Sequence, residues 1–427
     1  MIKKHFRVLL LLVFTCILAS GPLLAQLSMD VLADARDVRV RRGLPNIAQK
    51  LEAKEPVKVA YFGGSITEAK GGWREQSLAQ LRQLYPAVSF QEINAAIGGT
   101  GSDLGAFRLQ QHVLDHRPDL VLVEFAVNDN EKAPEDVIRS MEGIIRQVWN
   151  SNAHTDICFV YTLMASMAPV LEQGKLPVSA SAMERVADYY GIPSVHLGLE
   201  VVELARQGKL EYRGKPEDWP DKLVFSPDNV HPYPQTGHAL YAKAFVKALP
   251  ALLSTHSGWQ HNPGPPLDAQ NYERVAMLPA TQVEKSLGWR VLTPENDTVA
   301  HQLRHRFRQL IKANQPGEKL SFRFKGTQIG LYDVMGPGCG QYEVSIDGAP
   351  FTLISRFDEY CTYYRSNYFL LPRLAGGEHR VEFRIASAAP DKEAILRKRN
   401  TVMEGGPKYA ENACYAAELL LVGEILP

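Results

Sequence analysis

The first half of the chain alternates between two patterns of hydrophobic and polar positions. Short continuous apolar runs, typical of parallel strands buried on both faces, occupy residues 57–62, 88–93, 119–126, 157–162 and 193–196. Amphipathic stretches with helical spacing occupy residues 72–85, 102–115, 133–150, 179–190 and 235–250. This alternation predicts right-handed β-α-β units on one parallel sheet. The fold class is therefore α/β, with a flavodoxin-like three-layer α/β/α sandwich as the simplest architecture.

The pattern changes after the last of these helices. Residues 255–270 are rich in Gly and Pro, and we predict that they form a linker after a first domain over residues 26–254. Beyond the linker, apolar side chains occupy every second position in residues 320–324, 342–346 and 381–385. This period of two predicts an antiparallel β-sandwich domain over residues 271–427.

The amino terminus has the pattern of an export signal. Its first residues are basic, and an apolar stretch follows that reaches Ile17 and ends near Ala25. This order predicts a signal peptide over residues 1–25 and a secreted or periplasmic protein. The apolar run is shorter than a membrane-spanning helix requires and no later stretch approaches that length, so we expect no integral membrane span.

The charge balance narrows the range of partners. Among 427 residues, Lys and Arg together number 47, as do Asp and Glu, so the formal net charge is zero. This balance argues against nucleic acid and anionic membranes as partners. No Cys-x-x-Cys or paired His spacing indicates a metal, and we expect no cofactor. The oligomeric state is left open.

Export would permit disulfides among the cysteines that follow the signal peptide. Cys158 lies in an apolar run and is expected to be a reduced core residue. We expect one disulfide among Cys339, Cys361 and Cys414, with its pairing left open.

Candidate chemistry falls at the ends of the predicted strands. Ser65 follows two glycines after the first strand, a turn that suits a nucleophile but also a helix N-cap or an anion-binding loop. Ahead of the last helix, His231 could act as a base with Asp228 orienting it. Gly99 and Asn128 follow two other strands and could donate a backbone N–H and an amide N–H to an oxyanion. Singly each segment is also a common turn or cap, but together they favour an acyl-transfer site.

The segments Gly63-Gly64-Ser65-Ile66-Thr67, Gly99, Val127-Asn128-Asp129 and Asp228-x-x-His231 resemble, in order and approximate spacing, the four blocks of the SGNH, or GDSL-type, hydrolase family. The resemblance implies a serine esterase with Ser65 as nucleophile, His231 as base and Asp228 as the group that orients it. It also implies an oxyanion hole made of the Ser65 and Gly99 N–H groups and the Asn128 amide.

Two other positions belong to this resemblance. Arg108 resembles part of the second-block helix, and we assign it a structural role. Gly64 stands where the name motif of the family has Asp, so any contact made by that Asp side chain is absent here. We interpret this departure as a subfamily trait that leaves the nucleophile intact.

The C-terminal part resembles the β-sandwich appended to some bacterial SGNH proteins, most distinctively in residues 336–341 and 357–363. A run of four tyrosines could stack on sugar rings, although tyrosines in a strand are more often core or surface-pair residues; they are Tyr360, Tyr363, Tyr364 and Tyr368. The long polar segment 387–413 is either a solvated insertion or a loop that reaches the catalytic face.

These features predict an exported serine esterase that removes small acyl groups from a carbohydrate. The choice of acetyl as the acyl group follows from the resemblance to family members that deacetylate polysaccharides. An esterase acting on lipids or lysophospholipids is an alternative, but the sequence has no obvious apolar lid. A non-catalytic glycan-binding protein is a second alternative. Phosphate or nucleotide binding at Gly63-Gly64 is disfavoured because the turn lacks the Lys-Ser/Thr of a P-loop.

Overall fold

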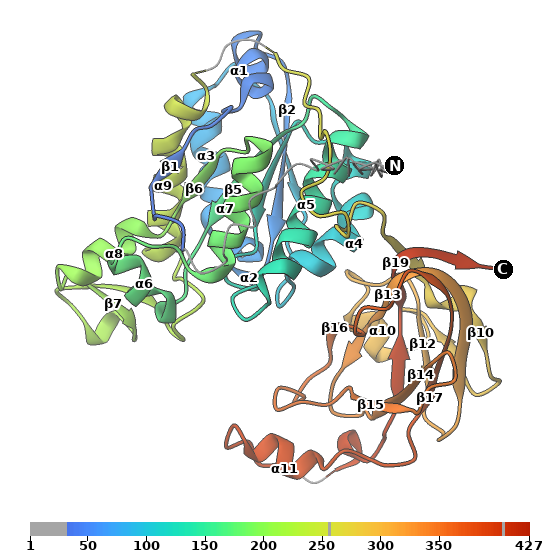
Figure 1. Ribbon diagram of the computed structural model, residues 1–427. Helices are drawn as coiled ribbons and strands as arrows, with labels where there is room; N and C mark the ends of the chain where they lie inside the picture. Colours follow the sequence, from blue (N-terminus) through green and yellow to red (C-terminus); the bar gives the residue numbers. More distant parts are fainter. Residues whose placement is uncertain (1–31, 255–257, 404–405) are drawn as a thin grey trace, which may run out of the picture. The chain divides into compact units, whose positions relative to one another are not determined.

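The predicted α/β pattern is confirmed in the computed structural model, which describes residues 32–254, 258–403 and 406–427 (Figure 1). The predicted signal peptide lies outside these residues. Five parallel strands pair in the order β3-β2-β4-β5-β6, and β1 adds an antiparallel edge beside β6. Their bounds are β1 (Val38–Arg39), β2 (Val57–Gly63), β3 (Phe90–Asn94), β4 (Leu120–Glu124), β5 (Asp156–Tyr161) and β6 (Ser194–His196).

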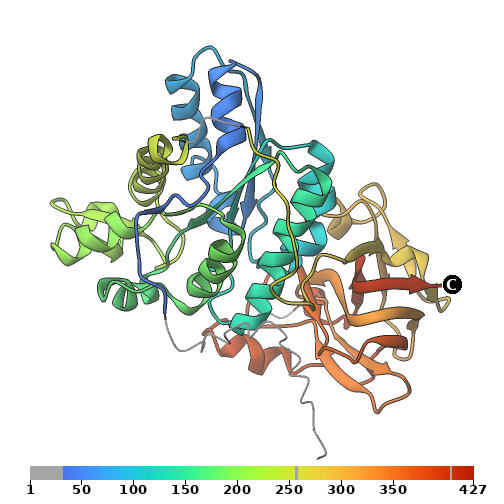
Figure 2. The ribbon, with the colours of Figure 1, turned by 45° about the horizontal axis from the view of Figure 1, so that its top comes forward.

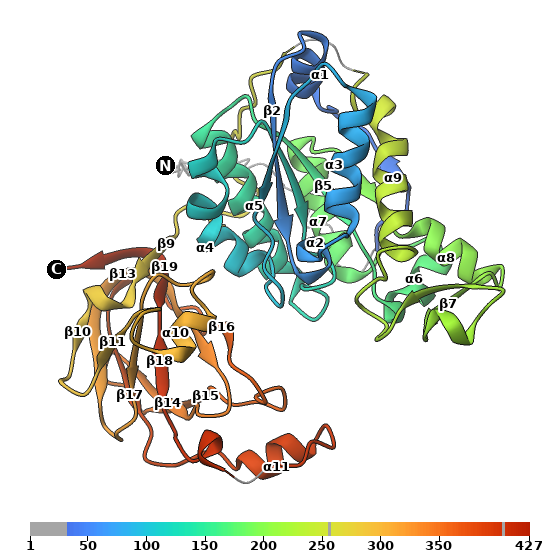
Figure 3. The same ribbon diagram turned by 180° about the vertical axis from the view of Figure 1, so that it is seen from behind.

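Helices cover both faces of this sheet, as expected for three layers. On one side α3 packs against α9, while α4, α5 and α7 pack together on the other (Figures 1 and 3). These five correspond to the predicted helices: α3 (Trp73–Leu84), α4 (Ser102–His112), α5 (Pro134–Ser151), α7 (Val178–Tyr190) and α9 (Gly237–Leu252). Shorter elements that the periodicity did not reveal are α1 (Pro45–Glu52), α2 (Ser65–Glu68), α6 (Ala168–Glu172), α8 (Leu199–Arg206), β7 (Leu210–Arg213) and β8 (Leu223–Ser226).

The strand order determines where a site can form. From β2 the chain moves outward to β3, whereas β4 lies on the other side of β2, so the direction of winding reverses between β2 and β4. Open α/β sheets bind ligands at the carboxyl ends of the strands at such a reversal. Ser65 follows β2 and Asn128 follows β4, so both residues lie at this point.

The C-terminal part consists of two antiparallel sheets. The long strand β13 pairs with β16, β17 and β19 in the larger sheet, and β11, β12 and β18 form the smaller one. The alternation is confirmed, because Leu320, Phe324 and Phe383 are fully buried. The elements are β9 (Ala276–Pro279), β10 (Glu284–Lys285), β11 (Arg290–Leu292), α10 (Thr298–Gln302), β12 (Leu310–Ala313), β13 (Lys319–Met335), β14 (Gln341–Ile346), β15 (Thr352–Ser355), β16 (Arg365–Leu370), β17 (Gly377–Ile385), α11 (Lys392–Arg397), β18 (Cys414–Ala416) and β19 (Glu418–Leu426).

An irregular segment joins the two patterns. Residues 258–275 contain no helix or strand and run beside α5, where the Tyr272 N–H donates to the Arg139 carbonyl (Figure 2). Helix α5 accommodates this close approach at Gly143, where a Cβ would lie 2.5 Å from the Tyr272 backbone. The residue limits predicted for the linker and the two domains stay predictions.

The expectation of a disulfide is wrong for the described residues: Cys339, Cys361 and Cys414 are free thiols in the interior. Two of these thiols donate to carbonyl oxygens at 3.4 Å, from Cys339 to Val334 and from Cys414 to Gln341. Each thiol is thus accommodated in packed protein without a partner sulfur. The prediction that Cys158 is a reduced core residue is confirmed.

Among residues 32–254, 258–403 and 406–427, no helix combines the length and apolar character needed to cross a membrane.

Candidate active site

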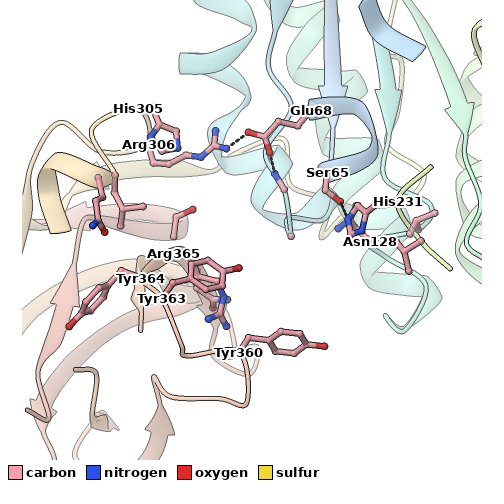
Figure 4. Close-up of a pocket in the computed structure, with 18 residues that line it drawn as sticks. Ser65, Glu68, Asn128, His231, His305, Arg306, Tyr360, Tyr363, Tyr364 and Arg365 are labelled. Atoms are coloured by element: carbon pink, nitrogen blue, oxygen red, sulfur yellow. Dashed lines mark hydrogen bonds and ion pairs between the residues drawn. The ribbon is translucent and has the colours of Figure 1, made fainter. Parts of the chain in front are cut away.

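The turn after β2 brings Ser65 to the first position of helix α2. Its hydroxyl lies 2.9 Å from Nε2 of His231 (Figure 4), and Nδ1 of that imidazole lies 2.7 Å from Oδ2 of Asp228. The carboxylate is an acceptor, so Nδ1 carries the proton and the lone pair of Nε2 faces the serine. The structure therefore brings Ser65, which follows β2, to the Asp228–His231 pair, in which His231 lies 166 residues later in the chain.

A tight loop between β8 and α9 presents the Asp–His pair. Asn229 adopts a left-handed conformation with φ 74°, and its N–H donates to the Ser226 hydroxyl at 2.8 Å. Within this loop Oδ1 of Asp228 accepts the backbone N–H groups of Val230 at 3.0 Å and His231 at 2.8 Å. Partial burial alone would raise the pKa of Asp228, but these donors and the imidazole lower it below its ordinary value. The carboxylate thus stays ionised where it orients His231.

The loops after β3 and β4 surround the serine. Gly99 has φ +72°, in the left-handed region that favours glycine. Within the described part of the chain, neither its N–H nor that of Ser65 donates to a protein acceptor. The Asn128 side chain lies against the turn, because a Cβ on Gly64 would be only 1.9 Å from Asn128 Oδ1. Glycine at position 64 therefore makes room for the amide.

A buried carboxylate that the sequence analysis did not single out forms hydrogen bonds with the turn that carries Ser65. Glu124, the last residue of β4, accepts the hydroxyls of Thr67 at 2.9 Å and Thr162 at 2.8 Å, and also the Gly64 N–H. Burial raises the pKa of Glu124, and the three donors oppose part of that effect. The sequence does contain a signal for Glu124, because an acidic residue at the end of a fully apolar strand is unusual unless the residue has buried partners.

Arg108 has the structural position assigned to it. The guanidinium is fully buried, donates to the carbonyls of Ala95 and Gly63, and lies 4.5 Å from the centroid of the Phe62 ring. Burial lowers its pKa to about 9. It therefore ties together the carboxyl ends of β2 and β3 rather than facing the serine.

The serine opens into a cleft of about 710 Å³ that is also lined by the C-terminal part (Figure 4). Tyr360 and Tyr363 line it and are 47% and 59% exposed. These two residues and Tyr364 precede β16 instead of lying in a strand, and the Tyr364 ring packs against that of Tyr415. Tyr368 does lie in β16, and its hydroxyl donates to Asp103 at 2.6 Å. Three of the four tyrosines therefore line the cleft, and the fourth, Tyr368, forms a hydrogen bond with Asp103.

The segment 387–413 agrees with neither of its two interpretations in full. The Lys392 ammonium donates to the carbonyls of Pro337 and Tyr409 at 3.0 Å, so the start of α11 packs against the rest of the C-terminal part, whereas Glu393 and residues 397–400 are exposed. The Arg399 guanidinium lies 4.1 Å from the centroid of the Tyr360 ring. The segment therefore contacts a residue of the cleft and supports it.

The site contains no obvious place for a metal: in the part of the chain that the structure describes, no group of three or more His, Cys, Asp or Glu side chains is arranged to bind one.

Residues 61–240 match the sequence model of the GDSL-like Lipase/Acylhydrolase family. The matched region contains Ser65, Asp228 and His231, so this part of the chain is similar to the GDSL-like acylhydrolases, and the protein is an ester-hydrolysing serine hydrolase. None of the curated proteins compared with the chain matches it.

Solved structures extend the likeness to both parts. A two-domain esterase (CEX) active on acetylated mannans, co-crystallized with mannopentaose, has a TM-score of 0.68 and 18% identity, with 92% of this chain and 100% of that chain covered. A second crystal structure of a two-domain esterase (CEX) active on acetylated mannans has the same TM-score and identity, with 90% of this chain and 97% of that chain covered. The shared feature is the fold, including the appended sandwich.

Proposed function

We propose that this protein is an exported esterase that removes acetyl groups from a carbohydrate, with Ser65 as nucleophile. The hydrogen-bonded series from Ser65 through His231 to Asp228, open to a cleft with exposed aromatic rings, is the observation that supports it best. In the same proposal residues 1–25 are removed on export, and residues 26–254 and 271–427 are separate domains joined by residues 255–270.

The proposed reaction is acyl transfer in two steps. His231 takes the hydroxyl proton as Ser65 Oγ attacks the ester carbonyl, and Asp228 stabilises the imidazolium that forms. The negative oxygen of the tetrahedral intermediate accepts hydrogen bonds from the Ser65 and Gly99 N–H groups and the Asn128 amide. His231 then returns the proton to the departing sugar oxygen, leaving an acyl-serine. Water, deprotonated by the same imidazole, releases acetate and restores the serine. No cofactor takes part.

The cleft lining favours a polar substrate over a lipid. Charged and polar side chains, among them Glu68, Arg306 and Arg365, face the same space as Ser65. A long acyl chain needs an apolar channel, and burying it beside these charged groups would displace the water that solvates them. Sugars present hydroxyls to such groups and apolar ring faces to Tyr360 and Tyr363. The two-domain esterase with the same fold acts on acetylated mannans, so acetylated mannan oligosaccharides are the first substrates to test.

A non-catalytic glycan-binding protein is the less favoured alternative. Binding alone does not require a serine hydroxyl 2.9 Å from an imidazole that is itself held by a carboxylate. That arrangement serves proton transfer.

A substrate panel distinguishes these functions. Purified protein is assayed with 4-nitrophenyl esters from acetate to long acyl chains, and acetate release is measured from acetylated mannan oligosaccharides. The proposal predicts a clear preference for acetyl and for the glycan. A preference for long chains would favour the lipid esterase, and binding of the oligosaccharide without turnover of any ester would favour the glycan-binding protein.

A further inference from the structure

Glu68 ends helix α2, one turn after Ser65, and each of its carboxylate oxygens has a different partner. Oε2 accepts the backbone N–H of Gly98 at 2.7 Å. Oε1 forms an ion pair with the guanidinium of Arg306, which follows helix α10 in the C-terminal part (Figure 4). One side chain therefore connects the helix of the nucleophile, the loop of the Gly99 donor and the C-terminal part.

The loop that contains Gly99 packs closely against helix α2. A Cβ on Gly98 would lie 3.0 Å from Glu68 Oε2 and 3.4 Å from the Ser65 Cβ, so glycine allows the loop to approach α2 closely. On the other side, no atom lies within 4 Å of the position that a Cβ on Gly99 would take. The hydrogen bond to Glu68 thus holds the residue before Gly99, while the Thr100 hydroxyl donates to the Ile97 carbonyl at 2.8 Å and closes the turn on the other side. The contact with Glu68 is the one of these two that links the Gly99 turn to helix α2.

The charge of Glu68 needs compensation. A carboxylate near the carbonyl under attack would repel the oxyanion that develops there, and this repulsion is strong where water is displaced. The Arg306 side chain is 16% exposed and that of Glu68 is 34% exposed, so the pair is partly shielded from solvent. Arg306 keeps the carboxylate available as an acceptor for Gly98 while cancelling its charge.

We propose that Glu68 is a positioning residue of the oxyanion hole, acting through Gly98 on Gly99, and that Arg306 is its counter-ion. The C-terminal part then influences the chemical step itself and not only the binding of substrate. This inference rests on the proposed esterase function.

The test compares kcat and KM for 4-nitrophenyl acetate, a substrate too small to depend on a sugar site. Glu68→Ala removes the acceptor of the Gly98 N–H, and we expect kcat to fall about 10- to 100-fold with KM within about twofold, the size of effect expected from a misplaced donor. Glu68→Gln keeps an acceptor oxygen and should retain kcat within about threefold of wild type. This rescue by the amide would not follow from loss of a tether between the two parts.

The most informative result is the sign of the coupling between substitutions at Glu68 and Arg306 in their effect on kcat. Arg306→Ala leaves the Glu68 carboxylate uncompensated, and kcat should fall about tenfold. In the double variant Glu68→Gln/Arg306→Ala no unpaired charge remains, so kcat should rise above that of Arg306→Ala. Glu273→Gln is the matched control, because Glu273 pairs with Arg146 at 2.7 Å with similar exposure but away from the cleft. That variant should keep wild-type kcat.

Three results would overturn the inference: wild-type kcat in Glu68→Ala, equal losses in Glu68→Ala and Glu68→Gln, or a double variant no faster than Arg306→Ala. Thermal unfolding of each variant identifies any that fail to fold. If Glu68→Ala fails to fold, the comparison of Arg306→Ala with the double variant tests the inference instead. If wild type hydrolyses no ester, the proposed function fails together with the inference. If wild type hydrolyses esters, Ser65→Ala does not, and the Glu68 and Arg306 variants behave like wild type, the inference alone fails.

Discussion

Replacing Gly64 by alanine probes the fit between the nucleophile turn and the Asn128 amide. Gly64 has φ −95° and ψ −155°, extended backbone that alanine also adopts, so the added methyl group acts through contact rather than backbone strain. The methyl carbon would lie 1.9 Å from Asn128 Oδ1, 2.7 Å from Cγ and 3.2 Å from Nδ2. Asn128 must therefore move, and with it the proposed oxyanion donor.

The size of the effect follows from these distances. To restore van der Waals contact the amide must withdraw by about 1 Å or more, and a misplacement of about 1 Å costs on the order of 10² in rate. Complete removal of one oxyanion donor costs about 10² to 10³ in kcat, or about 2.7–4 kcal/mol. We therefore expect Gly64→Ala to lower kcat by about 10² while leaving KM for a small ester nearly unchanged.

A double-mutant cycle isolates this cause. Asn128→Ala removes the side-chain atoms that the new methyl group would meet, so adding Gly64→Ala to it should cost less than about threefold more. The expected coupling energy is then about 2.1–2.7 kcal/mol. The assay measures kcat for 4-nitrophenyl acetate in the four proteins, with active sites titrated and thermal unfolding recorded. Additive losses, or wild-type kcat in Asn128→Ala, would refute the assignment of Asn128 as a donor.

Three further predictions concern the fold and the base. Burial lowers the pKa of His196 and His238 from 6.5 to about 4. Between these pH values the unfolded chain binds more protons than the folded protein, so the free energy of unfolding should fall on acidification by up to about 3 kcal/mol per histidine. Urea unfolding that is independent of pH in this range would disprove this prediction. Arg356→Met leaves the Asp333 carboxylate buried and unpaired and should cost about 3–5 kcal/mol in chemical denaturation, whereas an unchanged midpoint would show that the pair contributes nothing. Asp228→Asn removes the carboxylate that orients the imidazole and should lower kcat by up to about 10⁴ without affecting folding, so near wild-type kcat would exclude that role.

Local pattern was sufficient to predict the framework of the site. The parallel strands were visible as apolar runs, and sheet topology places their carboxyl ends together, so Ser65, Gly99 and Asn128 could be expected at one edge. Asp228 and His231 lie three residues apart, and a single turn brings such a pair into hydrogen-bond contact. These features depend on short-range spacing and on alternation, both of which a single sequence records.

Other features depend on contacts between distant segments. Glu68 and Arg306 are 238 residues apart, and neither has a local pattern that sets it apart from a surface charge. The fit of Gly64 to Asn128 is likewise a property of the folded chain. The expected disulfide failed for a related reason, because export permits disulfides in general but the packing around each thiol decides whether one forms.

The most direct test of the account is acetate release from acetylated mannan oligosaccharides by wild type and by Ser65→Ala. Both proteins are first shown to unfold at the same temperature and to bind the deacetylated oligosaccharide equally. We predict that wild type releases acetate and that the substitution lowers the rate by about 10⁴ to 10⁶. Substantial acetate release by Ser65→Ala would show that this serine is not the nucleophile.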